Sequence, residues 1–127
     1  MNDQCFTGED NRIGNHLLIE AEKQIIEYLK KERFSFDLPF SLVGTRFQLN
    51  VWQEALKISY GDTASYKDIA KKIGSPQAFR AVGAALKANP VHLLIPCHRV
   101  IGTNGNLGGY AGGELVKRSL LSLERLK

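Results

Sequence analysis

The sequence predicts a mostly α-helical protein with a short strand element, whose central unit is a helix-turn-helix of winged-helix type. Three observations predict this fold. Two short helical stretches, residues 66–73 and 76–88, meet at a glycine turn. One apolar, β-branched run covers residues 94–101. A longer amphipathic stretch lies toward each end of the chain, at residues 16–33 and 114–126.

The length and composition are those of one globular domain with a short appendage. The chain has 127 residues, of which 43% are hydrophobic and 24% are charged. Its two cysteines, Cys5 and Cys97, form neither a disulfide framework nor a metal-ligand cluster, which favours a reducing compartment. Residues 1–10 are polar and acidic, so we expect no signal peptide, and no apolar run reaches the length of a membrane span. We therefore expect a cytoplasmic protein with no metal, no cofactor and no membrane partner.

The charge balance changes sign at residue 42. Residues 1–42 carry five Lys/Arg and eight Asp/Glu, a net charge of −3, whereas residues 43–127 carry twelve and five, a net charge of +7. A basic part of this kind favours a polyanionic partner, with nucleic acid first, and the alternative is a solvated basic surface. We interpret residues 1–42 as a lead, a helix and an extended segment, and residues 43–127 as the functional domain.

The acidic part contains one predicted helix. Residues 1–15 are polar and lack periodicity, so we expect a flexible lead. Apolar residues then recur at helical spacing through residues 16–33, and Asn15 is placed to cap the start. Residues 34–40 alternate apolar and polar side chains, and Pro39 favours an edge strand or an extended segment.

The basic part begins with two capped helices. Thr45 is placed to cap a helix over residues 46–58. Ser65 and Asp68 have the spacing of a capping box, which predicts a helix over residues 66–73.

A glycine turn leads into the next helix. Gly74 fits the position after a helix end, and Pro76 fits the first position of a helix over residues 76–88. In a helix-turn-helix the start of the second helix meets the groove of DNA. Here that helix is rich in alanine and glycine and carries Arg80 near its start, which favours close approach to DNA. The alternative is an ordinary helical hairpin packed in a core.

The run at residues 94–101 contains a candidate nucleophile. It predicts a buried strand that Pro96 ends, so that Cys97 lies where the chain turns out of the strand. His98 and Arg99 supply a neighbouring base and a cation, which a nucleophilic thiolate needs. The alternative is an inert core cysteine, since free cysteine is among the most buried residue types.

A glycine-rich segment and a last helix follow. Six glycines lie within residues 102–113, around Tyr110, which favours a pocket wall over a flexible linker. The helix over residues 114–126 is predicted to direct Leu115 and the other leucines toward a core. Glu124 lies among these leucines, either as a solvated side chain or as the support of a catalytic base.

The stretch from Gly44 to Glu124 resembles the DNA-binding and active-site domain of the methylated-DNA–protein-cysteine methyltransferases, or alkylguanine-DNA alkyltransferases. The resemblance rests on short motifs in family-like order and spacing. They are Gly44-Thr45 with Phe47-Gln48 and Val51-Trp52, Ser65-Tyr66, Arg80-Ala81-Val82-Gly83, Asn89-Pro90, Ile95 through Ile101, Gly108 with Tyr110, Gly112-Gly113, and Lys117 through Leu121 to Glu124. It implies that residues 43–127 form a DNA-binding and methyltransferase domain of the alkyltransferase fold. Residues 1–42 then correspond to the end of a longer N-terminal domain.

The resemblance implies DNA repair by direct damage reversal. An alkyl group of 6-O-alkylguanine, or of 4-O-alkylthymine, passes irreversibly and stoichiometrically to Cys97 after the base has been flipped out of the duplex. His98 matches the base that deprotonates the thiol through a water molecule, Glu124 matches the carboxylate that orients His98, and Asn89 matches a brace of the active-site turn. A thioether has no easy leaving group, so each molecule acts once.

The resemblance also implies a partner and its contacts. The partner is double-stranded DNA carrying alkylated guanine, bound by a monomer. Arg80 matches the residue that fills the vacated base position, and Tyr66 matches the residue that rotates the nucleotide. The implied DNA contacts are Tyr66, Arg80, Ala81, Gly83, Lys87 and Arg99. The implied base pocket consists of Pro96, Val100, Tyr110, Ala111 and Gly112, with Ala111 where many members have a serine.

Three other functions can be weighed against this one. A non-catalytic sensor of alkyl lesions would resemble the same domain, but such sensors replace the acceptor cysteine. A helix-turn-helix regulator leaves the glycine-rich segment and Glu124 without a role. A cysteine hydrolase that uses Cys97 and His98 leaves the basic helical pair unexplained.

Overall fold

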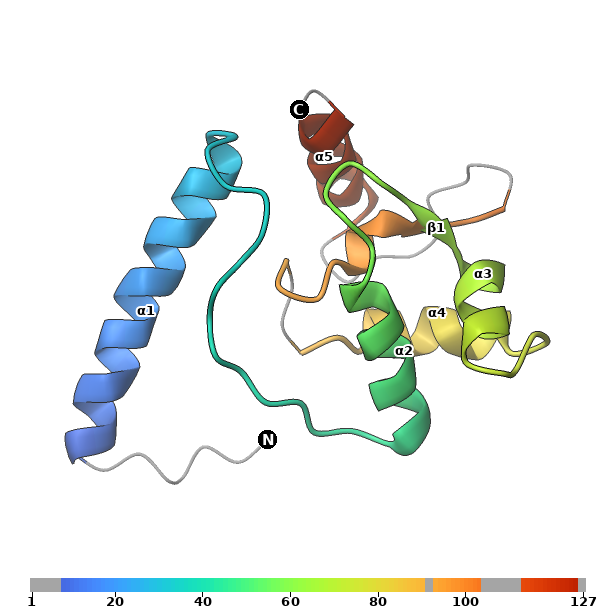
Figure 1. The fold of residues 1–127 in the computed structure, drawn as a ribbon, viewed down its shortest axis with the longest axis horizontal. Coiled ribbons are helices and arrows are strands. Elements are labelled where there is room, and N and C mark those ends of the chain that lie inside the picture. The colour runs from blue at the N-terminus through green and yellow to red at the C-terminus, as the bar shows by residue number, and fades with distance from the viewer. Residues whose placement is uncertain (1–7, 91–92, 104–112, 126–127) are drawn as a thin grey trace. The chain divides into compact units, whose positions relative to one another are not determined.

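The computed structural model describes residues 8–90, 93–103 and 113–125. The chain divides into two compact units, Met1–Val43 and Gly44–Lys127. The described residues form five α-helices, one short 3₁₀ helix and a two-stranded sheet (Figure 1). The prediction of a mostly helical fold with a short strand element is therefore confirmed. Within these residues no helix is both long and apolar enough to span a bilayer.

The first unit begins with a helix that is longer than predicted. Helix α1 covers Gly8–Leu29, so its start precedes the predicted start at residue 16, and Asn15 lies inside the helix rather than at its cap. The reason is that propagation adds one hydrogen bond for each further residue, so a helix continues beyond the periodic stretch that reveals it. The predicted flexible lead is wrong for residues 8–15.

The chain after α1 is held to that helix by one buried side chain. Gln24 on α1 is 2% exposed. Its side-chain amide donates to the carbonyl of Asp37 at 3.1 Å and accepts from the Asp37 N–H at 2.9 Å. Residues 34–40 belong to no helix and pair with no strand in the described part of the chain, and bends lie at residues 34 and 35.

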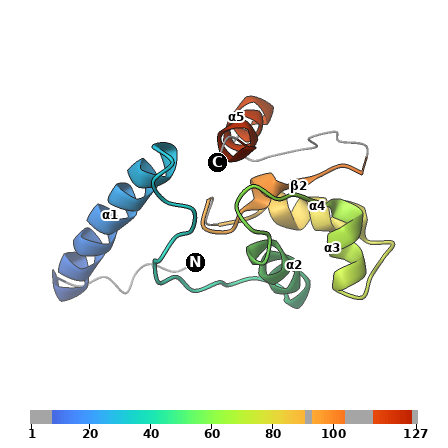
Figure 2. The same cartoon turned by 45° about the horizontal axis from the view of Figure 1, so that its top comes forward.

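In the second unit, three helices pack against one another. They are α2 (Arg46–Leu56), α3 (Tyr66–Lys72) and α4 (Phe79–Lys87), drawn from green to yellow in Figures 1 and 2. The Thr45 cap of α2 and the Ser65–Asp68 capping box of α3 are both present. Gly74 has a φ of 82°, a left-handed conformation that favours glycine after a helix end.

Helix α4 begins later than predicted, at Phe79 rather than at Pro76. The N–H of Ala78 donates to the carbonyl of Ser75 at 2.9 Å and closes a turn over residues 75–78. Proline at the second position suits such a turn because its φ is fixed. Pro76 therefore starts the turn rather than the helix.

Trp52 fixes α4 against α2. Its indole is 2% exposed, and Nε1–H donates to the carbonyl of Ala85 at 2.9 Å. Val51 on α2 and Val82 on α4 are fully buried as well. This packing holds α4 in place and leaves its other face exposed.

The predicted strand over residues 94–101 is shorter and is interrupted. Ile95 forms a single bridge, and a 3₁₀ turn over Cys97–Arg99 follows Pro96, where the chain was expected to turn. Strand β2 (Val100–Ile101) then pairs in parallel with β1 (Ala64–Ser65), with Ala64 opposite Val100. The cysteine thus lies in a short turn anchored at both sides by backbone pairing.

Helix α5 covers Glu114–Arg125, and its buried residues are Lys117, Leu121 and Glu124. The predicted core position of Leu115 is wrong, because this side chain is 76% exposed. A helix turns by about 100° per residue, so Lys117, Leu121 and Glu124 share one face and Leu115 lies on another. The buried face of α5 therefore carries a cation and a carboxylate as well as a leucine.

Gly44 provides a test of the packing around Trp52. A Cβ at Gly44 would lie 2.9 Å from the Trp52 ring, closer than real Cβ contacts allow. We expect Gly44→Ala to lower the free energy of unfolding by about 1–3 kcal/mol, the usual cost of overpacking. Gly83→Ala is the matched control, because its Cβ would meet the Tyr66 ring at an ordinary 3.7 Å. Urea denaturation measures both variants, and equal stabilities would contradict this packing.

Candidate active site

Cys97 lies in the 3₁₀ turn and is 3% exposed. Asn89, just after the end of α4, braces this turn with its side-chain amide. The Asn89 Nδ2 donates to the carbonyl of Ile95 at 2.9 Å and to the Cys97 Sγ at 3.2 Å. A hydrogen bond donated to sulfur stabilises the thiolate relative to the thiol.

Glu124 on α5 binds the two residues that follow the cysteine. Its Oε2 lies 2.7 Å from His98 Nε2 and 2.9 Å from Arg99 Nη2, and its Oε1 accepts from Arg99 Nε at 2.8 Å. Glu124 is 1% exposed and His98 is fully buried. A carboxylate so deeply buried needs a counter-charge, which the bidentate guanidinium supplies. Of the two alternatives for Glu124, the geometry agrees with support of His98 and excludes a solvated side chain.

The two ring nitrogens of His98 have different surroundings. Nε2 faces a carboxylate that can only accept a hydrogen bond, which places the ring proton on Nε2. Nδ1 is buried and has no hydrogen-bond partner within the described residues. In this tautomer Nδ1 keeps a free lone pair, which is the feature that a general base needs.

Arg99 does not lie where a DNA contact requires it. It is 7% exposed, and besides its two bonds to Glu124 it donates from Nη1 to the carbonyl of Ile58 at 2.7 Å. Its guanidinium carbon also lies 5.7 Å from the centre of the Tyr60 ring. A buried guanidinium with these partners cannot reach a phosphate, so the predicted DNA contact is corrected. Arg99 neutralises Glu124 and ties the cysteine turn to the chain after α2.

Lys117 is a site residue whose part the sequence reasoning missed. It is fully buried, and its Nζ donates to the carbonyl of Val100 at 2.6 Å and to the Tyr66 hydroxyl at 3.3 Å. Burial lowers the pKa of Lys117 to about 8, against the opposing attraction of a Cys97 thiolate. Burial also raises the pKa of Tyr66, and the charge of Cys97 raises it further. The spacing of Lys117 and Glu124, two helical turns apart on one face, is the sequence signal for this shared burial.

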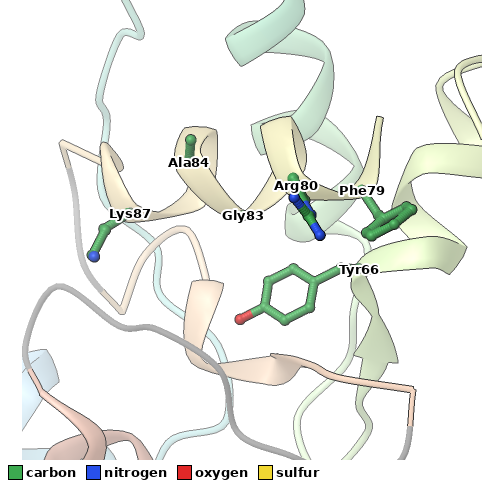
Figure 3. A pocket seen from close by; sticks show the side chains of 6 residues that line it. All are labelled: Tyr66, Phe79, Arg80, Gly83, Ala84 and Lys87. Atoms are coloured by element: carbon green, nitrogen blue, oxygen red, sulfur yellow. The ribbon is translucent and has the colours of Figure 1, made fainter. Parts of the chain in front are cut away.

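A second group of predicted site residues lies along α3 and α4. Four of them line a hollow of about 400 Å³, whose lining residues are Tyr66, Phe79, Arg80, Gly83, Ala84 and Lys87 (Figure 3). Phe79 and Arg80 come from the first turn of α4 and face Tyr66, whereas Lys87 lies at the other end of the helix. The structure thus brings together four of the predicted DNA contacts, Tyr66, Arg80, Gly83 and Lys87. Ala81 is exposed on the same helix but does not line this hollow.

The predicted base pocket is described only in part. Pro96 and Val100 are buried on either side of the cysteine turn. Tyr110, Ala111 and Gly112 lie outside the described residues, so their part in a pocket wall stays a prediction. Among the residues with described positions, no three His, Cys, Asp or Glu side chains are grouped to hold a metal ion.

The chain is similar to known proteins over most of its length. Residues 46–126 match the family model of the 6-O-methylguanine DNA methyltransferase DNA-binding domain. The inducible methylated-DNA–protein-cysteine methyltransferase of Bacillus subtilis is 45% identical over 130 residues, covering 97% of this chain and 73% of that protein. The corresponding enzyme of Mycobacterium leprae is 45% identical over 129 residues, covering 98% of this chain and 77% of that protein.

A solved structure extends the similarity to the fold. The Mycobacterium tuberculosis OGT in complex with DNA superposes with a TM-score of 0.82 at 48% identity, covering 84% of this chain and 66% of that chain. The chain therefore spans about two thirds to three quarters of the length of these relatives. The predicted alkyltransferase fold is confirmed.

Glu124 is expected to be required for the stability of the cysteine turn. Its removal leaves Arg99 buried without a counter-charge, so we expect Glu124→Ala to lower the free energy of unfolding by about 3–5 kcal/mol. Glu114→Ala is the matched control on the same helix, because its ion pair with Arg118 is 64% exposed on both sides. Such a surface pair contributes about 0–1 kcal/mol. Urea unfolding followed by circular dichroism compares the two, and similar losses would contradict a network that depends on Glu124.

Proposed function

We propose a repair function on one premise: the chain belongs to the methylated-DNA–protein-cysteine methyltransferase family. On this premise it reverses alkylation damage directly, by transferring the alkyl group of 6-O-alkylguanine, and of 4-O-alkylthymine, from DNA to Cys97. The observation that carries the proposal is the buried turn in which Cys97 is held by Asn89 and is followed by the His98–Glu124 pair.

The first chemical step is deprotonation of the thiol. His98 acts as the base through Nδ1, which has no hydrogen-bond partner among the described residues, and a water molecule passes the proton from Cys97. Glu124 holds the Nε2–H tautomer and stabilises the imidazolium that forms, as in other catalytic triads. The Asn89 amide and the Lys117 ammonium favour the resulting thiolate by hydrogen bonding and by charge.

The second step is displacement at the alkyl carbon. The Cys97 sulfur forms a bond to this carbon while the bond from carbon to the guanine oxygen breaks. The electron pair stays on the oxygen, and the restored guanine regains a proton that balances the one lost by the thiol. Because a thioether is a poor leaving group, the transfer is irreversible, and each molecule is consumed by one lesion.

DNA binding and base flipping precede this chemistry. Arg80 and Lys87 are exposed cations on α4, and Gly83 leaves part of the α4 wall of the hollow without a side chain, which permits close approach to DNA. Arg80 then fills the position vacated by the flipped base, and Tyr66 at the opposite wall crowds the nucleotide as it rotates (Figure 3). Ala81 is placed on the same helix as a further contact. The partner is double-stranded DNA carrying alkylated guanine, and the protein acts as a monomer in the cytoplasm with the chromosomal DNA.

The alternative is a sensor that binds the lesion without repairing it. A sensor would need neither the hydrogen bond from Asn89 to Cys97 nor a buried His98 nitrogen that lacks a partner in the described part of the chain. Both are features that a nucleophile and its base need. We therefore favour transfer over sensing.

Transfer is tested by intact-protein mass spectrometry after incubation with a duplex that contains one 6-O-methylguanine. We expect one added methyl group per molecule, mapped to Cys97 by peptide analysis and absent from Cys97→Ser. Binding of the duplex without a gain in mass would favour the sensor. A methyl group on Cys5 would indicate non-specific thiol chemistry and contradict the assignment of Cys97.

A further inference from the structure

We propose that Phe79 is a base-stacking residue, which packs its ring on the nucleotide next to the one that is flipped out. This inference rests on the proposed function and gives Phe79 a part in lesion recognition on the DNA-binding face. Phe79 lines the hollow along α4 but has no role in the steps described above.

The ring of Phe79 lies between two hollows. It lines the hollow of about 400 Å³ along α4, and it also lines a second one of about 520 Å³ together with Tyr66, Lys67 and Gly102. Val82 and Leu86 on the same helix are buried in the core, whereas Phe79 is only half-buried. Half-burial holds the ring in place and leaves part of it open to a ligand.

The surroundings of Phe79 are cationic. The Lys67 ammonium lies 5.4 Å from the centre of the ring, and the exposed Arg80 and Lys87 line the same hollow. An aromatic ring among cations is the arrangement that binds unpaired or unstacked bases, since the ring packs on the base and the cations attract the phosphates. The occupant that this chemistry fits is a nucleotide of the bound DNA.

The position beside Arg80 indicates which nucleotide is bound. When a base leaves the duplex, each of its neighbours exposes a face that was stacked before. Arg80 fills the vacancy, and Phe79 precedes it in the chain and lies beside it in Figure 3. An apolar ring at this place can enter a neighbouring base step from the groove, as apolar wedges do in other DNA-bending proteins. Phe79 would thus make up for the stacking that a neighbouring base loses.

The test uses three variants of Phe79 in a Cys97→Ser background, which separates binding from transfer. Phe79→Ala removes the ring, Phe79→Leu keeps an apolar side chain, and Phe79→Trp keeps an aromatic one. Each is titrated with a duplex that contains 6-O-methylguanine and with the same duplex undamaged, and fluorescence of 2-aminopurine on either side of the lesion reports stacking. Thermal unfolding identifies any variant that fails to fold.

We expect Phe79→Ala and Phe79→Leu to weaken binding of the damaged duplex about tenfold, the scale of one lost stacked base, and Phe79→Trp to restore it. Binding of undamaged DNA and the salt dependence should change little, because no charge is removed. One flanking 2-aminopurine should be brighter with Ala or Leu than with Phe or Trp.

Two results would overturn the inference. If Phe79→Leu binds the damaged duplex as well as the parent does, the ring acts only through apolar packing. If damaged and undamaged duplexes lose affinity equally, Phe79 has no part in lesion recognition. Failure of the proposed function is distinguishable, because it appears as an absence of methyl transfer to Cys97 in the protein that retains Phe79.

Discussion

The structure around the cysteine depends on one buried carboxylate. Glu124 is almost fully excluded from solvent, and a charge in that position is tolerated only with a counter-charge and hydrogen bonds. Arg99 supplies the counter-charge and His98 the further contact. Because Nε2 of the imidazole is held by the carboxylate, the other nitrogen of His98 has no hydrogen-bond partner among the described residues, as the proposed base requires. Arg99, although it lies beside the cysteine, therefore binds Glu124 within the protein and does not contact DNA.

Helices α4 and α5 hold the cysteine turn from two sides. On α5, Lys117 shares the buried face with Leu121 and Glu124, and its Nζ donates to the carbonyl of Val100. Just after the end of α4, Asn89 donates a hydrogen bond to the sulfur itself. The start of the same helix carries Arg80 on the proposed DNA-binding face. One short helix thus connects the surface that would meet DNA with the side chain that positions the thiol.

Features set by local chemistry could be predicted from the sequence, and features set by tertiary packing could not. The Ser65–Asp68 capping box and the left-handed Gly74 each depend on a few neighbouring residues, and both were predicted. Pro76 also has a local preference, but a turn and a helix start both satisfy it, and the turn is what forms. The face of α5 was predicted from leucines alone, which placed Leu115 in the core. The burial of the Arg99 guanidinium could not be predicted, because its partner Glu124 lies on a helix that is distant in the sequence.

In the proposed mechanism His98 acts through a free lone pair on Nδ1, which Glu124 leaves available by holding the ring proton on Nε2. Heteronuclear NMR of the His98 ring nitrogens at neutral pH reports which nitrogen carries the proton. We expect a protonated Nε2 and an unprotonated Nδ1, and a change in this pattern when Glu124 is replaced by glutamine. A proton on Nδ1 with a bare Nε2, or a doubly protonated ring in the unreacted protein, would show that Glu124 does not hold His98 in this tautomer.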